Sequence, residues 1–243
     1  MEIKVKALCV RSVDYRDNDS LITLASLERG KITAVVRGSK KQTSKLRFSA
    51  SLFCFAEYIL TVSKSGRYTV TGCDLIDGFY ALREDVEKFY VASISAEILE
   101  KNLYLPNDKL ILTTLKTLKS LCYNEKEMVS AIIEYTYKAM LCLGYSLPKI
   151  ECKVCGLKRD LYFDKTTLDF VCKAHKENKG IGLTSKEVGL FTEVYFDRTE
   201  NFENFDNATR QNVLYILIKY FESISEQTYK TYKSYFDLLK EIY

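Results

Sequence analysis

The chain has 243 residues, of which 47% are hydrophobic and 28% are charged, the balance of a folded protein. This composition excludes global intrinsic disorder, and a net charge of only +4 does not by itself indicate a nucleic-acid-binding protein. The charge is unevenly distributed, however. Residues 1–80 carry 13 basic and 8 acidic side chains, whereas residues 81–243 carry 23 and 24. The whole positive excess therefore lies in the first third of the chain.

The N-terminal segment has charged side chains at positions 2, 4, 6 and 11, which leaves no apolar core for a signal peptide. No run approaches the roughly 18 apolar residues that a membrane helix needs. We therefore expect a cytoplasmic protein with no membrane association. In that reducing compartment, clustered cysteines indicate metal binding rather than disulfides. Five cysteines lie singly in apolar runs and are expected to be buried as small hydrophobic residues: Cys9, Cys54, Cys73, Cys122 and Cys142.

Residues 1–77 have the pattern of about five short strands. Apolar residues alternate with charged ones at the start of the chain, and again strictly over residues 52–62. Residues 21–27 and 31–36 are apolar runs joined by a turn that ends in Gly30, and a Ser/Gly-rich turn leads into residues 68–71. This spacing predicts a small barrel or sandwich.

The segment after the third predicted strand, residues 37–47, is strongly basic and is named here the basic loop. It has hydroxyl and amide side chains but no acidic one, a mixture that suits phosphate oxygens. Loops between the strands of small barrels are also where such barrels bind nucleic acid. The alternative is a solvated loop kept basic for solubility. We predict a nucleic-acid-binding site that consists of Arg37, Lys40, Lys41, Lys45 and Arg47.

Aromatic side chains that could stack on bases are plentiful near this loop, although any single one is expected in the core more often than on the surface. The candidates are Tyr15, Phe48, Phe53, Phe55, Tyr58 and Tyr68.

From about residue 80 the apolar residues recur every three to four positions, which predicts helices. Gly144 has the position of a helix C-cap, residues 184–187 form a capping box, and Asp206 can cap a further helix. The expected fold class is α+β with two domains: a β-barrel in residues 1–80 and a helical domain in residues 81–243. A metal-binding module is expected within the helical domain at about residues 150–178.

The signal for that module is a pair of short motifs, Cys152-x-x-Cys155 and Cys172-x-x-His175, separated by 16 residues. Each motif can place two ligands on one ion, and the apolar residues between the motifs suggest a hairpin that brings the second pair back to the first. Three thiolates and one imidazole fill a tetrahedral Zn²⁺ shell, and His175 is the only histidine in the chain. We therefore predict a zinc site.

Two other readings of this motif are weaker. A redox Cys-x-x-Cys pair would leave Cys172 and His175 unexplained. A catalytic zinc needs an open coordination position. Glu177 follows His175 as in zinc deaminases, but in those enzymes the H-x-E motif precedes the paired cysteines. With four ligands available, we expect a structural Zn²⁺, and because motifs for nucleotide binding or a nucleophilic serine are lacking, we expect no enzyme.

Four features resemble the RecO family of bacterial recombination and DNA-repair mediators. Three are sequence motifs: residues 10–24, similar to the family's opening strand pair; residues 30–41, similar to its strand and basic loop; and residues 141–156, similar to the entry of its zinc module. The fourth is the order of a barrel, helices and a zinc insert. The resemblance extends over most of the chain.

The resemblance implies an N-terminal OB-fold, a helical C-terminal domain with a zinc module, and a bacterial, nucleoid-associated location. It implies binding of single- and double-stranded DNA, annealing of complementary strands, and cooperation with RecR in loading RecA onto DNA coated by single-stranded-DNA-binding protein (SSB). It also places Arg37, Lys40, Lys41 and Lys45 at the DNA. Zinc-bearing relatives usually have a second Cys-x-x-Cys, whereas here His175 holds the last position, and imidazole can replace thiolate on zinc.

Three alternatives remain open at this point. The chain could be a zinc-containing OB-fold protein that binds RNA or acts in transcription. It could be a zinc hydrolase or deaminase that uses Glu177. It could also be a scaffold whose basic loop binds nothing.

Overall fold

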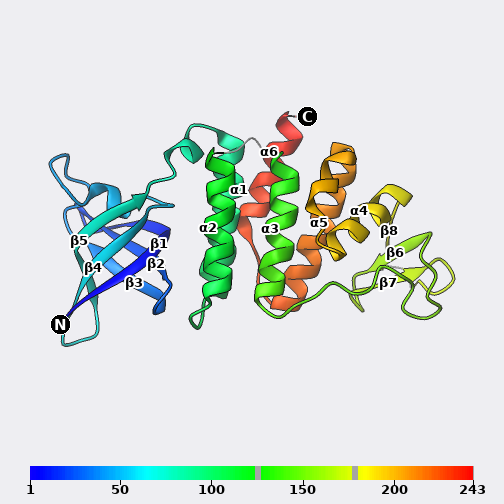
Figure 1. Cartoon of the computed structure of the whole chain (residues 1–243), viewed down its shortest axis with the longest axis horizontal. Coiled ribbons are helices and arrows are strands. Elements are labelled where there is room, and N and C mark those ends of the chain that lie inside the picture. Colours follow the sequence, from blue (N-terminus) through cyan, green and yellow to red (C-terminus); the bar gives the residue numbers. More distant parts are fainter. Residues whose placement is uncertain (124–126, 177–179, 243) are drawn as a thin grey trace. The chain divides into compact units, whose positions relative to one another are not determined.

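Five strands in the first 77 residues close into a barrel in the computed structural model (Figure 1). The structure describes residues 1–123, 127–176 and 180–242. The barrel strands are β1 (Glu2–Tyr15), β2 (Asp19–Ser26), β3 (Gly30–Val36), β4 (Phe55–Val62) and β5 (Tyr68–Asp77). All five lie where the sequence predicts strands.

The long first strand lets the barrel close. The N-terminal half of β1 pairs with β4 and its C-terminal half pairs with β2, both antiparallel, with an irregularity between Cys9 and Arg11 where β1 changes partner. On the far side β3 pairs with β5 in parallel, with Ala34 opposite Tyr68. The strand order β1-β2-β3-β5-β4 is that of an OB-fold, which confirms the fold expected for the N-terminal part.

The barrel core follows the period of two that the sequence shows. Inward side chains from all five strands are almost completely buried: Val5, Ala7, Cys9, Ile22, Leu24, Ile32, Ala34, Val36, Cys54, Ala56, Tyr58, Leu60 and Val70. The alternation predicted from residue 52 becomes a strand only at Phe55. Phe53 has a left-handed backbone with φ 68° and its ring is buried against Phe89, 5.8 Å between centroids, so the chain turns there before it enters β4.

Three helices belong to the same compact unit as the barrel, which comprises residues 1–124 and 229–243. They are α1 (Val86–Asn102), α2 (Asp108–Tyr123) and α6 (Lys230–Ile242), and a short 3-10 helix, η2 (Tyr80–Arg83), precedes them. Helix α1 contacts β1, α2 and α6. The C-terminal helix therefore joins a unit whose other residues lie more than a hundred positions earlier in the chain.

The turn between β2 and β3 attaches the barrel to these helices. Gly30 has φ 69°, and a Cβ atom there would lie only 3.1 Å from the backbone nitrogen of Pro106. The Lys31 ammonium donates to the backbone carbonyl of Glu100 at 2.7 Å, and Arg11 forms an ion pair with the Glu100 carboxylate at 3.4 Å. Glycine is required at this turn for both its backbone conformation and its lack of a side chain.

The second compact unit, residues 125–228, combines helices with a small sheet. The helices are α3 (Met128–Cys142), α4 (Ser185–Tyr195) and α5 (Asn207–Ser225), with a 3-10 helix η3 (Thr199–Asn204). The strands β6 (Leu161–Asp164), β7 (Asp169–Cys172) and β8 (Gly180–Gly182) form an antiparallel sheet of order β7-β6-β8. The hairpin expected between the two metal-binding motifs is thus β6–β7.

The predicted helix ends of this unit are confirmed. Gly144 follows α3 with φ 84°, and the Thr184 and Glu187 side chains form both hydrogen bonds of a capping box at α4. The Asp206 carboxylate accepts from the backbone N–H of Thr209 at 2.9 Å. These local polar groups satisfy backbone atoms that a helix end leaves free.

An aromatic cluster packs the small sheet against the helices of its unit. Phe163 and Phe170 lie opposite each other on β6 and β7, with centroids 5.8 Å apart. Phe170 meets Phe191 of α4 at 5.4 Å, and Phe163 meets Tyr220 of α5 at 6.2 Å. The inner face of the sheet is therefore anchored, and its opposite face carries Tyr162 and Val171.

The α+β fold class is the expected one, with an OB-fold barrel followed by helices and a sheet that carries the cysteine motifs. The domain boundary expected near residue 80 stays a prediction. Among the singly placed cysteines, Cys9, Cys54 and Cys122 are buried and Cys73 and Cys142 are half-buried. In the described part of the chain, we find no helix whose length and apolar character would let it span a membrane.

Candidate nucleic-acid interface and metal centre

The basic loop starts from a base that is hydrogen-bonded to the β1–β2 turn. The backbone N–H of Gly38 donates to the Asp19 carboxylate at 2.8 Å, and the Ser39 and Ser20 hydroxyls are 2.8 Å apart. The N–H of Lys40 donates to the carbonyl of Asn18 at 3.1 Å. Two turns distant in sequence are thereby joined, and the loop leaves the barrel from a defined point.

The other end of the loop is fixed by a 3-10 helix, η1 (Arg47–Ala50), at the start of the return to β4. The buried Tyr58 hydroxyl donates to the carbonyl of Ser49 at 3.0 Å, and Phe48 packs against the barrel core. Because Phe53 and Tyr58 are fully buried, neither is a surface on which a base could stack. Tyr15, Phe48, Phe55 and Tyr68 are partly exposed.

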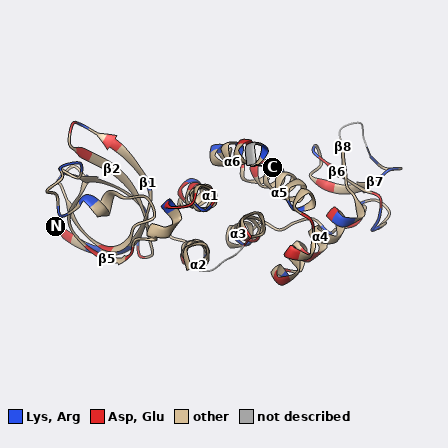
Figure 2. Ribbon diagram, turned by 90° about the horizontal axis from the view of Figure 1, so that it is seen from above, with Lys and Arg blue, Asp and Glu red and all other residues tan. Residues whose placement is uncertain are grey.

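Between these two fixed ends, the five cations predicted to bind DNA differ in their surroundings. The Lys40 ammonium lies 2.6 Å from the carboxylate of Asp14 on β1. The other four are exposed and form no ion pair with any residue that the structure describes: Arg37, Lys41, Lys45 and Arg47. Figure 2 shows basic residues on the loops at the edge of the barrel. The loop thus presents four free cations, and the role of Asp14 as a counter-ion was not visible in the sequence.

The second predicted site is assembled in the second unit. The ligand atoms of Cys152, Cys155, Cys172 and His175 all lie within 4.8 Å of one another. The Cys155 and Cys172 sulfurs are 3.8 Å apart, and the Nδ1 atom of His175 is 3.5 Å from the sulfur of Cys152 and 3.3 Å from that of Cys172. The structure therefore brings together all four residues that the spacing predicts.

Turn geometry explains how the two motifs meet. After Cys155, Gly156 adopts φ 72° and its N–H donates to the carbonyl of Cys152 at 2.7 Å, which closes the first turn. The N–H of His175 closes the second turn on the carbonyl of Cys172 at 2.9 Å. The N–H of Lys153 donates to Phe170 at 2.9 Å, so the first turn is attached to β7 directly.

One cysteine thiol of this cluster, Cys152, is prepared for ionisation by its backbone surroundings. Burial disfavours the Cys152 thiolate, but backbone N–H groups of Cys155, Cys172 and Val154 point at its sulfur and outweigh this effect, lowering its pKa to about 6. Thiolate is the form that binds metal. The backbone N–H of Leu157 favours the Cys155 thiolate, but the neighbouring Cys152 and Cys172 sulfurs and burial together outweigh it and raise the pKa of Cys155. A cation between the sulfurs would remove this repulsion.

The cluster fits a tetrahedral metal ion. With metal–sulfur and metal–nitrogen bonds of about 2.3 and 2.0 Å, a tetrahedron separates two sulfurs by about 3.8 Å and a sulfur from a nitrogen by about 3.5 Å. The separations of 3.8, 3.5 and 3.3 Å agree with these values. The cluster is thus able to hold a metal ion through three sulfurs and one imidazole nitrogen. Glu177, the residue of the deaminase alternative, lies outside the described residues.

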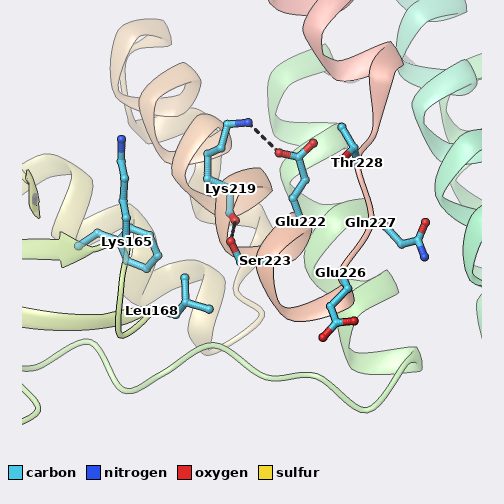
Figure 3. Close-up of a pocket in the computed structure, with 9 residues that line it drawn as sticks. Lys165, Leu168, Lys219, Glu222, Ser223, Glu226, Gln227 and Thr228 are labelled. Atoms are coloured by element: carbon cyan, nitrogen blue, oxygen red, sulfur yellow. Dashed lines mark hydrogen bonds and ion pairs between the residues drawn. The ribbon is translucent and has the colours of Figure 1, made fainter.

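A shallow pocket of about 290 Å³ lies between the β6–β7 turn and the C-terminal end of α5 (Figure 3). Its charges are balanced, because two lysines, Lys165 and Lys219, and two glutamates, Glu222 and Glu226, line it, and Lys219 is 2.7 Å from Glu222. This mixed lining does not favour an anion, in contrast to the basic loop.

Comparisons with known proteins identify the family of this chain. Residues 1–79 match the family described as Recombination protein O N terminal, and residues 83–233 match Recombination protein O C terminal. A DNA repair protein RecO from Acetivibrio thermocellus is 26% identical over 180 residues, 72% of this chain and 71% of that protein. The RecO protein of Clostridium novyi is 26% identical over 202 residues, 82% and 78% of the two chains.

A third relative, the DNA repair protein RecO of Syntrophomonas wolfei, is 33% identical over 164 residues, 66% of this chain and 64% of its own. The two family matches together extend over the barrel, the metal cluster and most of the helices. The chain therefore belongs to the RecO family of DNA repair proteins.

Proposed function

We propose that this protein binds single- and double-stranded DNA through the basic loop and anneals complementary strands during recombinational repair. The observation that carries the proposal is a group of four exposed cations on an OB-fold barrel that form no ion pair with a described residue: Arg37, Lys41, Lys45 and Arg47. Membership of a family of DNA repair proteins favours DNA over RNA as the polyanion.

The chemistry of the loop suits annealing. Two strands repel each other through their phosphates, and a protein that neutralises phosphates without reading base edges lowers this repulsion for any sequence. Lysine and arginine on an exposed loop provide such contacts, and Gly38 lets the backbone approach a phosphate closely. Because the bases stay free, they can pair with a second strand.

Salt dependence tests the proposal. Five phosphate contacts to a single strand would give a slope of log affinity against log salt of roughly −3.5. Since Lys40 is already paired with Asp14, four free cations predict a slope of about −2.8. Affinity for a labelled oligonucleotide should be measured by fluorescence anisotropy over a range of salt concentrations. An affinity that does not change with salt would contradict the electrostatic mechanism.

We further propose that the ion held by Cys152, Cys155, Cys172 and His175 is a structural Zn²⁺. A zinc ion so bound contributes folding free energy to the unit that holds it. Four protein ligands leave no position for water or substrate, so we propose a protein that acts without catalysing a chemical step. Elemental analysis of the purified protein should find one zinc per chain.

The resemblance also supports a place in a larger assembly. We propose that the protein works with RecR to load RecA onto SSB-coated single strands, in the cytoplasm at the bacterial nucleoid. Co-purification with RecR and an annealing assay on SSB-coated strands separate this role from that of an RNA-binding or transcription-associated protein. Failure of both assays would contradict the mediator role and favour that alternative.

A further inference from the structure

The solvent-exposed side of α2 carries a row of three lysines. Five exposed residues recur there at spacings of three and four, and they are named here the α2 stripe: Lys109, Leu112, Lys116, Lys119 and Tyr123. At 3.6 residues per turn these positions lie on one side of the helix. The opposite side is buried in the unit through Leu110, Ile111, Thr114, Leu118, Leu121 and Cys122.

The α2 stripe differs from the exposed faces of the other helices. Four helices balance a lysine with a carboxylate three or four residues away: Glu97–Lys101 in α1, Glu134–Lys138 in α3, Lys219–Glu222 in α5 and Asp237–Lys240 in α6. Helix α2 has one acidic residue, Asp108 at its first position. Its three lysines make no ion pair with the described residues, and Lys116 and Lys119 are close enough to repel each other.

The absence of carboxylates among these lysines matters because opposite charges three or four residues apart stabilise a solvated helix, whereas like charges destabilise it. A face that carries only cations is less stable by itself, and an anion that binds across it removes the repulsion. The rise of the helix places Lys109 and Lys119 about 15 Å apart along its axis. One strand of a duplex carries a phosphate every 3.4 Å or so, which means that the row spans about four phosphates.

The apolar members of the stripe agree with the same ligand. Leu112 and Tyr123 are 47% and 60% exposed, so both are accessible to a ligand that lies along the stripe. The Tyr123 hydroxyl donates to the Asp77 carboxylate at 2.9 Å, which holds its ring at the end of the stripe. The Asp77 carboxylate is thus engaged by this hydroxyl. An aromatic ring beside a row of cations is the combination that binds single strands.

We propose that the α2 stripe is a second binding site for the phosphate backbone of nucleic acid. It belongs to the same compact unit as the barrel. The inference rests on the proposed DNA binding by the basic loop and extends it: a unit with two backbone sites can hold two strands, or two segments of one strand, as annealing requires.

The test is the full-length variant Lys109→Gln/Lys116→Gln/Lys119→Gln. Glutamine keeps helix propensity close to that of lysine, so α2 should remain folded. The matched control is Lys230→Gln/Lys233→Gln/Lys240→Gln, which removes the same charge from exposed positions of α6 in the same unit. The slope of about −2.8 is the share of the four loop cations, and three further contacts from the α2 stripe make the expected wild-type slope for single-stranded DNA about −4.9. We expect the α2 variant to return the slope to about −2.8 and to slow annealing, while the control behaves as the wild type.

The outcomes separate this inference from the proposed function. If the wild type binds DNA and the α2 variant equals the α6 control, the α2 site is wrong while DNA binding by the basic loop stands. If the wild type does not bind DNA at all, both fail. A gain-of-charge variant, Leu112→Lys, guards against an unfolded triple variant: it should steepen the slope by about 0.7, and an unchanged slope would overturn the proposal.

Discussion

The basic loop and the metal cluster are both built from turns, yet their side chains are arranged in opposite ways. In the loop, hydrogen bonds fix the backbone at its base, and the free cations extend into solvent. In the cluster, backbone N–H groups and two turns aim four ligand atoms at one point, all within 4.8 Å of one another. The basic loop exposes its cations to solvent, whereas the metal cluster directs its sulfur and nitrogen atoms towards a common point.

Because of this difference, the two regions should respond differently when one side chain is removed. A polyanion makes several similar contacts, so each cation of the loop contributes a separate and partial share of binding. A tetrahedral ion needs every ligand, so the loss of one position removes most of the effect. Four variants test the metal cluster, the fold and the basic loop, and the first is expected to be the most damaging.

Replacing one ligand of the cluster should be the most damaging change. For Cys172→Ser we expect loss of the bound metal and a fall of roughly 4 kcal/mol in the free energy of unfolding, because a lost metal belongs to the largest class of destabilising effects. Elemental analysis and urea unfolding measure the two quantities. Cys122→Ala, at a buried cysteine outside the cluster, should keep its metal. Equal metal content in Cys172→Ser and the wild type would contradict the assignment.

The next test concerns a carboxylate that stabilises the fold and is not one of the metal-cluster residues. Glu97 of α1 accepts from the backbone N–H groups of Lys230 and Thr231 at 3.0 and 2.9 Å, at the start of α6. Partial burial disfavours its charge, but these bonds and Lys101 outweigh burial and hold its pKa below the usual value. Glu97→Gln should lower the free energy of unfolding by about 2 kcal/mol at neutral pH, without changing the DNA salt slope.

The pH dependence of this effect has a definite sign. Because the folded-state pKa of Glu97 lies below its unfolded value, the stabilisation is complete above the unfolded pKa and is lost as pH falls through the folded one. Wild type and Glu97→Gln should therefore converge in acid. Glu84→Gln, at an exposed glutamate of the same unit, is the control and should have little effect at any pH. A constant difference between wild type and Glu97→Gln down to low pH would argue against the mechanism.

The basic loop should lose binding in steps. In Lys41→Gln/Lys45→Gln/Arg47→Gln we expect the salt slope for single-stranded DNA to become less negative by about 2, with an unchanged free energy of unfolding. The three lysines of α6 named above, replaced by glutamine, provide the charge-matched control. Equal slopes for the loop variant and this control would show that the loop is only a solvated turn.

The smallest expected effect comes from the counter-ion. Asp14→Asn frees Lys40, so the slope should steepen by about 0.7, from four contacts towards five. Asp17→Asn removes the same charge from an exposed position in the neighbouring turn and should change the slope less. If both variants behave alike, Lys40 is not a separate contact and only net charge matters.

The strands, the helix caps and the metal-binding motifs could be predicted from the sequence because each depends on residues that are close together in the chain. A period of two marked the barrel strands, and caps such as Asp206 act on N–H groups within a few residues. The candidate metal ligands could also be predicted, since a two-residue spacer lets two side chains reach one ion independently of the surrounding fold. Fold class and metal cluster were both predicted in this way, and the structure agrees with them.

Contacts between distant residues were not readable. The positions of Asp14 and Lys40 in the sequence do not predict that they form an ion pair. They come together because Gly38 and Ser39 form hydrogen bonds with the first two residues of β2. The lysines of α2 stand at regular positions in the sequence, but a lysine row has meaning only once the exposed side of the helix is known. The exposed side is the one opposite the apolar residues that pack into the core.

Local sequence patterns were sufficient to predict the elements, the barrel pattern, the excess of charge on the basic loop and the four candidate metal ligands. Each of these depends on neighbours along the chain, where covalent geometry limits the choices. The folded chain was needed to find that four of the five loop cations form no ion pair with a described residue, that α6 belongs to the unit of the barrel, and that α2 exposes a row of lysines. These depend on burial and on charges brought close through space, and both arise only when the chain packs.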